Sequence, residues 1–148
     1  MTLLILATIL SAYELLWAMV KERHPVVATK YELVAEGGHR IGAPSAEHVA
    51  EHFIQAEFNA DRQPDYAIVV VPRAAVGGYA VLALLEQGRD EMVVTVIDHA
   101  DGRAEGVTLA AHSRKKAGAV LVVTPQNGKA RRFAWDVASE TFRELPPG

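Results

Sequence analysis

The sequence predicts a small mixed-sheet protein of the α/β or α+β class, preceded by an apolar helix. Three features of the 148-residue chain predict this class. They are an almost wholly apolar stretch from Met1 to Val20, three dense valine-rich runs, and an Asn127-Gly128 turn before two short alternating stretches. We therefore divide the chain into an apolar helix over residues 1–23 and a single domain over residues 24–148.

The segment from Leu3 to Val20 has the length and composition of a transmembrane helix. Its apolar side chains point in every direction around a helix axis, so no polar stripe is left. A helix of about 20 residues spans the roughly 30 Å hydrocarbon core of a bilayer. Lys21 and Arg23 follow the segment, and this cationic flank predicts an N-terminus outside and a domain in the cytoplasm. We expect a single crossing of an inner or plasma membrane, and no signal peptide because a basic start and a cleavage site are both missing.

Glu14 is the one charged residue inside this apolar segment. A carboxylate costs roughly 2 to 3 kcal/mol near the centre of a bilayer and usually faces another protein segment there. The predicted membrane and partner contacts are Ser11, Tyr13, Glu14 and Trp17. Two alternatives stay open: Glu14 lies close enough to the interface to be hydrated, or the helix is buried in a soluble core or an oligomer interface.

Composition narrows the function classes. The formal net charge is −3 and charged residues make up 22% of the chain, so no nucleic-acid-binding surface is expected. The basic run from Arg114 to Lys116 is short and is interpreted as a solvated turn. There is no cysteine, which excludes disulfides, thiolate metal sites and a cysteine nucleophile.

A break, a strand and a helix are expected after the apolar segment. Pro25 disfavours the helical conformation for the residue before it, so the first helix should end there. Val26 to Ala35 is rich in β-branched and aromatic residues and alternates in part, which predicts a half-exposed strand. After a glycine-bearing loop over residues 36–44, Ser45 is a good N-cap for an amphipathic helix from Ala46 to Phe58.

The three valine-rich runs predict covered strands. They are Ala67 to Val71, Met92 to Ile97 and Ala119 to Thr124, and their starts are 25 and 27 residues apart. Uninterrupted apolar strands are typical of parallel sheets, and each gap has room for a crossover helix. We expect such a helix over Tyr79 to Gln87. Residues 103–118 are left open, as a helix or as a strand paired with Met92 to Ile97.

The end of the chain predicts an antiparallel hairpin. Asn127-Gly128 is a strong signal for a two-residue hairpin turn. Arg132 to Val137 and Thr141 to Leu145 alternate apolar and polar residues, which predicts two short strands.

His48, Glu51 and His52 form the most chemical-looking string in the chain. They have the H-x-x-E-H order of inverted zinc peptidases. Two histidines four residues apart on a helix can share a metal, and the glutamate can polarise a bound water. The simpler interpretation is that all three lie on the polar stripe of a surface helix, since no further acidic ligand is apparent. A divalent metal such as zinc is the one cofactor considered, and none is otherwise expected.

Asp98 and His99 follow directly on the second valine-rich run and form a candidate ligand-binding site. In parallel α/β sheets ligands bind beyond the carboxyl ends of the strands. The simpler alternative is that Asp98 caps the turn sequence DHADG. No glycine-rich phosphate motif and no nucleophilic serine motif occurs.

These observations predict a single-pass membrane-anchored accessory, assembly or regulatory protein that acts through protein contacts of a small cytosolic domain. Its expected partners are the membrane and another membrane protein, and a homo-oligomer is allowed. One alternative is a small metal-dependent enzyme built on the H-x-x-E-H helix. The other is a soluble ligand-binding α/β domain with its N-terminal helix buried in a homodimer.

Overall fold

The structure is a computed structural model that describes residues 2–35, 45–74, 77–87 and 91–147. Within the first helix, side chains are described from Ala12 onward. The loop predicted over residues 36–44 lies outside the described residues.

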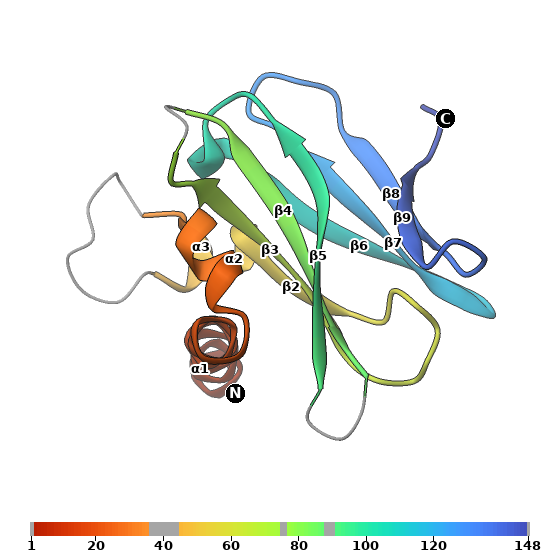
Figure 1. Cartoon of the computed structure of the whole chain (residues 1–148), viewed down its shortest axis with the longest axis horizontal. Coiled ribbons are helices and arrows are strands. Elements are labelled where there is room, and N and C mark those ends of the chain that lie inside the picture. Colours follow the sequence, from red (N-terminus) through yellow and green to blue (C-terminus); the bar gives the residue numbers. More distant parts are fainter. Residues whose placement is uncertain (1, 36–44, 75–76, 88–90, 148) are drawn as a thin grey trace.

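The described chain is arranged in three layers (Figure 1). The helical layer holds α1 (Thr2–Arg23), α2 (Pro25–Lys30) and α3 (Ala46–His52). The middle layer is a five-stranded sheet of β1 (Tyr31–Leu33), β2 (Phe53–Ala56), β3 (Asp65–Pro72), β4 (Tyr79–Glu86) and β5 (Met92–Ala100). The third layer is a four-stranded sheet of β6 (Thr108–Arg114), β7 (Ala117–Thr124), β8 (Arg131–Asp136) and β9 (Thr141–Glu144).

Both sheets are antiparallel. The first has the order β1-β3-β4-β5, with β2 also paired to β3, and the second has the order β6-β7-β8-β9. This arrangement decides between the two predicted classes in favour of α+β, and the expected βαβ order is wrong. Of the three valine-rich runs, Ala67 to Val71 in β3 is covered on both faces, because helices lie on one side of the first sheet and the second sheet on the other. The run in β5 is covered only in part, since Val93 and Val96 are about half exposed.

The helix predicted over Tyr79 to Gln87 is wrong, because Tyr79–Glu86 is strand β4. Seven of its eight residues are buried, on both faces of the strand. Leucine and alanine favour a helix in isolation, but burial between two layers outweighs that weak preference. Only residues 73–78 separate β3 from β4 in the sequence. This short length permits an antiparallel hairpin, whereas a parallel crossover needs a dozen residues or more.

Two further elements differ from the prediction at their boundaries. The strand expected over Val26 to Ala35 is a short helix, α2, with Pro25 in its first turn, and only Tyr31–Leu33 is extended. The helix expected over Ala46 to Phe58 ends at His52, and Phe53–Ala56 continues as β2 beside β3. Pairing with β3 thus takes over residues that the helical pattern alone assigned to α3.

The C-terminal elements follow the prediction. The open segment over residues 103–118 contains strand β6, but β6 pairs with β7 and not with Met92 to Ile97. The predicted antiparallel strands at the end of the chain are confirmed, because β8 pairs with both β7 and β9. The two-residue turn predicted at Asn127-Gly128 is wrong, since residues 125–130 connect β7 to β8 and Gly128 is not among the glycines with a positive φ. The chain leaves the first sheet after β5, and β6 is the first strand of the second sheet, so it pairs within that sheet.

The described half of α1 packs on the first sheet. Its buried side chains recur at helical spacing: Tyr13, Leu16, Trp17 and Val20. They share a core with residues of α3, β3 and β4, among them Val49, Ile68 and Leu82. Within the part of the chain that the structure describes, no helix is long and apolar enough to cross a membrane. The predicted transmembrane span is therefore not confirmed.

Candidate functional site

The two histidines of the H-x-x-E-H string are buried and not on a wet stripe. His48 Nε2 lies 2.8 Å from the carbonyl oxygen of Val34. His52 is fully buried; its Nδ1 lies 2.7 Å from the carbonyl oxygen of His48 and its Nε2 lies 3.1 Å from that of Glu105. The two rings connect α3 to the segment after β1 and to the segment before β6. Because both rings are buried, the interpretation that His48 and His52 lie on a solvated polar stripe is wrong.

The third member of the string points elsewhere. Glu51 is exposed, whereas His48 and His52 face inward with their ring centroids 4.4 Å apart. Among the described residues, no group of three or more histidine, aspartate or glutamate side chains is placed to hold a metal ion. The geometry thus brings the two histidines together and separates them from the proposed water-polarising carboxylate.

Asp98 and His99 lie on opposite faces of β5. Asp98 is opposite Val81, whose side chain faces the second sheet, and His99 is opposite Ala80, whose side chain faces the helices. Asp98 is buried and accepts a 2.6 Å hydrogen bond from Arg131 Nη1 of β8. The pair therefore does not form one site, and Asp98 is part of a contact between the two sheets.

Arg131 is the centre of that contact, and no motif in the sequence indicates this role. Its Nη2 and Nε also donate to the two carboxylate oxygens of Glu144, at 2.6 and 3.2 Å. Its guanidinium carbon lies 5.2 Å from the ring centroid of Phe133. The hydrogen bonds to Glu144 raise the pKa of Arg131 and lower the pKa of Glu144. These hydrogen bonds from Arg131 join β5 to β8 and β9. Because the guanidinium stays charged at neutral pH, Arg131 does not act as a proton donor there.

The N-terminal contact residues divide between the core and the surface. Tyr13 and Trp17 are buried against the first sheet, and the ring of Tyr13 meets Phe53 edge-on at 5.6 Å. Burial raises the pKa of Tyr13 to about 12. Glu14 is exposed, and the side chain of Ser11 lies outside the described residues. The predicted set is therefore split, with its aromatic members used inside the protein.

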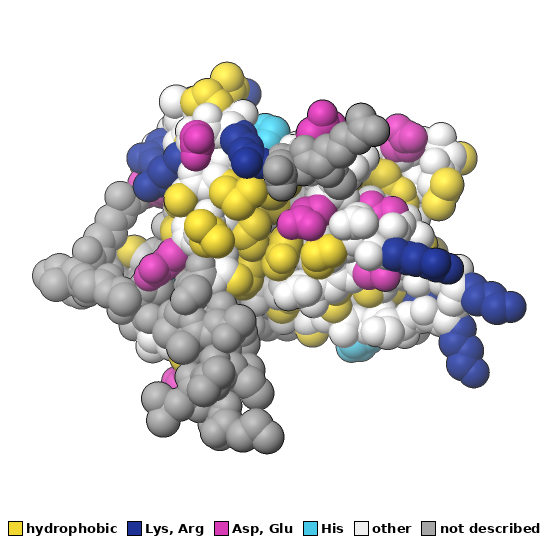
Figure 2. Space-filling model, turned by 90° about the horizontal axis from the view of Figure 1, so that it is seen from below, with side chains coloured by type: hydrophobic (Ala, Val, Ile, Leu, Met, Phe, Trp, Pro, Cys, Tyr) yellow, Lys and Arg dark blue, Asp and Glu magenta, His cyan; other side chains and the backbone are white. Residues whose placement is uncertain are grey.

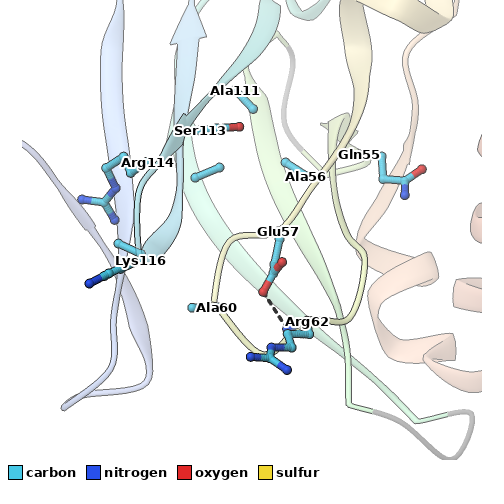
Figure 3. A pocket seen from close by; sticks show the side chains of 11 residues that line it. Gln55, Ala56, Glu57, Ala60, Arg62, Ala111, Ser113, Arg114 and Lys116 are labelled. Atoms are coloured by element: carbon cyan, nitrogen blue, oxygen red, sulfur yellow. Dashed lines mark hydrogen bonds between the residues drawn. The ribbon is translucent and has the colours of Figure 1, made fainter.

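An open pocket lies between the two sheets (Figure 3). It has a volume of about 540 Å³. One wall is β2 and the loop after it, and the other is the hairpin of β6 and β7. Its polar lining residues are Gln55, Glu57, Arg62, Ser113, Arg114 and Lys116, and its other lining residues are all alanines. The cationic residues come from two segments about fifty positions apart, so no local motif reveals them.

The backbone around this pocket is unusual. Ala60, Arg62 and Lys116 line the pocket and have φ values of 57°, 64° and 58°. Non-glycine residues adopt this left-handed conformation rarely, and such residues are found at functional sites more often than elsewhere. Hydrogen bonds within the loop hold it: Arg62 N–H donates to Glu57 Oε1 at 2.6 Å. The shape of the pocket is thus fixed by its own backbone.

Asp65 anchors the loop from below. Its Oδ2 accepts a 2.9 Å hydrogen bond from the backbone N–H of Phe58, and its side chain is fully buried. Burial raises the pKa of Asp65 to about 6, and the hydrogen bond from Phe58 acts in the opposite direction. A carboxyl group that supports the pocket therefore titrates near neutral pH.

This shift predicts a pH dependence of stability. The folded state keeps the proton of Asp65 up to pH about 6, whereas the unfolded chain releases it near its usual pKa of 3.8. Stability therefore falls as pH rises from about 4 to 6, by roughly 3 kcal/mol. Urea unfolding of the wild type and of Asp65→Asn at pH 4 and pH 7 measures this change in the free energy of unfolding. Between pH 4 and pH 7 the wild type should lose more stability than the variant, and an equal change in both would contradict the prediction.

The chain matches no protein-family model, no curated protein and no solved structure.

Proposed function

We propose that this protein is an accessory or regulatory component that binds an extended segment of another protein along the free edge of β5. The observation that carries the proposal is that β5 is nine residues long and, among the described strands, hydrogen-bonds only to β4. An open strand edge presents unpaired backbone donors and acceptors to an incoming strand. Addition of a strand to such an edge is a common mode of peptide recognition.

The chemistry of β5 supports this use. Residues Met92 to Ile97 contain no charged side chain, and Val93 and Val96 are 46% and 47% exposed. Proteins usually protect long strand edges with lysine, proline or short length. The other edges of the first sheet follow that rule, because β1 has three residues with Glu32 among them and β2 has four. The edge of β5 has none of these protective features from Met92 to Val96. The pairing with β4 becomes irregular only after Val96, opposite Val81 and Leu82.

Exposed apolar side chains occur on both faces of this edge. Val93 is opposite Leu85 and Val96 is opposite Leu82, so the two valines point to opposite sides of the sheet. Figure 2 shows hydrophobic side chains gathered near the middle of one face of the molecule, with both acidic and basic side chains around them. A partner strand with apolar residues on both faces fits β5 best, since side chains of neighbouring strands pack pairwise on each face.

Lysine substitutions at the edge test the proposal. Val93→Lys and Val96→Lys place a charge on exposed positions, so the free energy of unfolding should change by no more than about 0.5 kcal/mol. A photo-crosslinking residue in place of Thr95, which is half-buried and belongs to neither core cluster, should join the otherwise wild-type chain in cells to one discrete protein. Both lysine variants should reduce that product at least about tenfold, since a desolvated charge opposes strand pairing.

Val137→Lys is the matched control, because Val137 is 74% exposed in the turn between β8 and β9. This variant should leave the cross-linked product unchanged. A cross-linked product that contains two copies of this chain would show that the chain forms a homodimer and does not bind another protein in this way. A product equally abundant in all variants, or none at all, would contradict binding at β5.

Two earlier expectations bear on this proposal. The expected location at an inner or plasma membrane, with the domain in the cytoplasm, stays a prediction. The metal-dependent enzyme is not favoured, because the described His48 and His52 meet backbone carbonyl groups and Glu51 points away from them.

A further inference from the structure

The pocket between β2 and the β6–β7 hairpin has a positive rim. Arg62 lies on one wall, and Arg114 and Lys116 lie on the hairpin that forms the other wall. Glu57 is the one carboxylate among the lining residues. The whole chain carries a formal net charge of −3, so this local excess of cations departs from its overall balance. Cations gathered at a cleft with low-dielectric walls raise the local concentration of anions.

The cationic groups are available for a ligand. Within the described part of the chain, the side chains of Arg62 and Lys116 form no ion pair. Arg114 uses its Nε to donate to the carbonyl oxygen of Gly118 at 2.8 Å, which leaves both of its terminal nitrogens as donors. Glu57 is occupied in part by the backbone N–H of Arg62 (dashed in Figure 3). The rim therefore offers more donors than the protein itself satisfies.

The interior of the pocket is left open by small side chains. Five of its lining residues are alanines: Ala56, Ala60, Ala111, Ala117 and Ala119. Its volume of about 540 Å³ is within the range of small-molecule sites and exceeds what one bare oxyanion fills. Apolar methyl groups inside and cationic groups at the rim suit a ligand with an anionic head and a small organic body.

We propose that this pocket binds a small phosphate monoester, with Arg114 and Lys116 on one wall and Arg62 on the opposite wall supplying the positive charge, and with the alanines lining the space for the organic part. Guanidinium groups match phosphate oxygens in pairs of parallel hydrogen bonds, and Lys116 adds a mobile point charge. The hydroxyl of Ser113 is a further donor on the same wall. This site is separate from the edge of β5, so each proposal can fail without the other.

Isothermal titration calorimetry of the full chain with glycerol 3-phosphate, inorganic phosphate and succinate, at low salt, tests the proposal. Glycerol 3-phosphate should bind saturably to one site, with inorganic phosphate binding more weakly because it lacks the organic part. Arg62→Gln/Lys116→Gln should weaken binding by at least about tenfold, since two charges near the anion are lost. Glu57→Gln should tighten binding by about threefold, because it removes the one repulsive charge and keeps the acceptor for Arg62 N–H.

Arg132→Gln is the matched control, since Arg132 is an exposed cation of β8 that does not line the pocket. It should leave the affinity unchanged, and thermal unfolding should show that every variant is folded. Equal weakening by Arg132→Gln, or no saturable binding of the wild type, would overturn the site. Succinate binding as tightly as glycerol 3-phosphate would overturn the assignment to phosphate.

Discussion

Replacing Gly118 with alanine is expected to lower the free energy of unfolding by about 4 kcal/mol or more. Gly118 lies in β7, where the second sheet meets the loop that follows β2. A Cβ atom at this position would lie 1.6 Å from the carbonyl oxygen and 2.3 Å from the carbonyl carbon of Phe58. Both are backbone atoms, so no side-chain rotation relieves the overlap.

The surrounding structure makes the displacement costly. Phe58 is fully buried between the sheets, and its N–H is held by Asp65. The next residue of β7, Ala119, donates its N–H to the carbonyl oxygen of Glu57 at 2.7 Å. Moving the loop away from Gly118 would therefore break hydrogen bonds on both sides of the contact and distort the wall of the pocket.

Urea denaturation followed by tryptophan fluorescence measures the effect, with Gly77→Ala as the control. Gly77 has a φ of +79°, but an added Cβ would meet nothing within 4 Å. The control should therefore cost only about 1 kcal/mol, from backbone conformation alone. Similar midpoints for both variants would show that the second sheet does not sit against Phe58 in this way.

Replacing Trp17 with alanine is expected to cost about 3 to 5 kcal/mol, the usual range for a buried tryptophan. Trp17 is 4% exposed and belongs to the core that α1 shares with the first sheet. Its loss would leave a cavity beneath the helix that neighbouring strands can fill only in part. Calorimetric or urea unfolding of the purified chain measures the change.

Two substitutions on the same helix separate packing from other effects. Leu15 is 63% exposed, so Leu15→Ala should change stability by no more than about 0.5 kcal/mol. The buried hydroxyl of Tyr13 has no hydrogen-bond partner among the described residues, so Tyr13→Phe should be neutral or stabilising. If α1 were instead embedded in a bilayer, Trp17→Ala would leave the unfolding of the remaining chain nearly unchanged.

Local patterns predicted those elements whose cause is local. The helix break at Pro25 and the N-cap at Ser45 each depend on the conformational limits of a few residues. Ser45 does cap α3, since its hydroxyl accepts from the backbone N–H of His48. The three valine-rich runs are strands for a similar reason, because β-branched side chains favour extended backbone wherever they are packed.

The candidate sites were harder to predict, because spacing along the chain does not say which way a side chain points. His48 and Glu51 are three residues apart, yet one is buried and the other exposed. The basic run from Arg114 to Lys116 has the composition of a solvated turn, and nothing in the local sequence connects it with Arg62. Only the approach of β6 to β2 places these cations around one pocket.

The sequence by itself thus determined the apolar N-terminal helix, the three valine-rich strands and the antiparallel strand pair at the end of the chain. The tertiary structure alone decided that Tyr79–Glu86 is a strand, that the sheets are antiparallel, and that α1 packs on one of them. The physical reason is that an apolar segment is stabilised by whatever surface buries it. Its composition demands burial, but the layer that provides it, whether a sheet, a helix or a bilayer, is set by contacts distant in sequence.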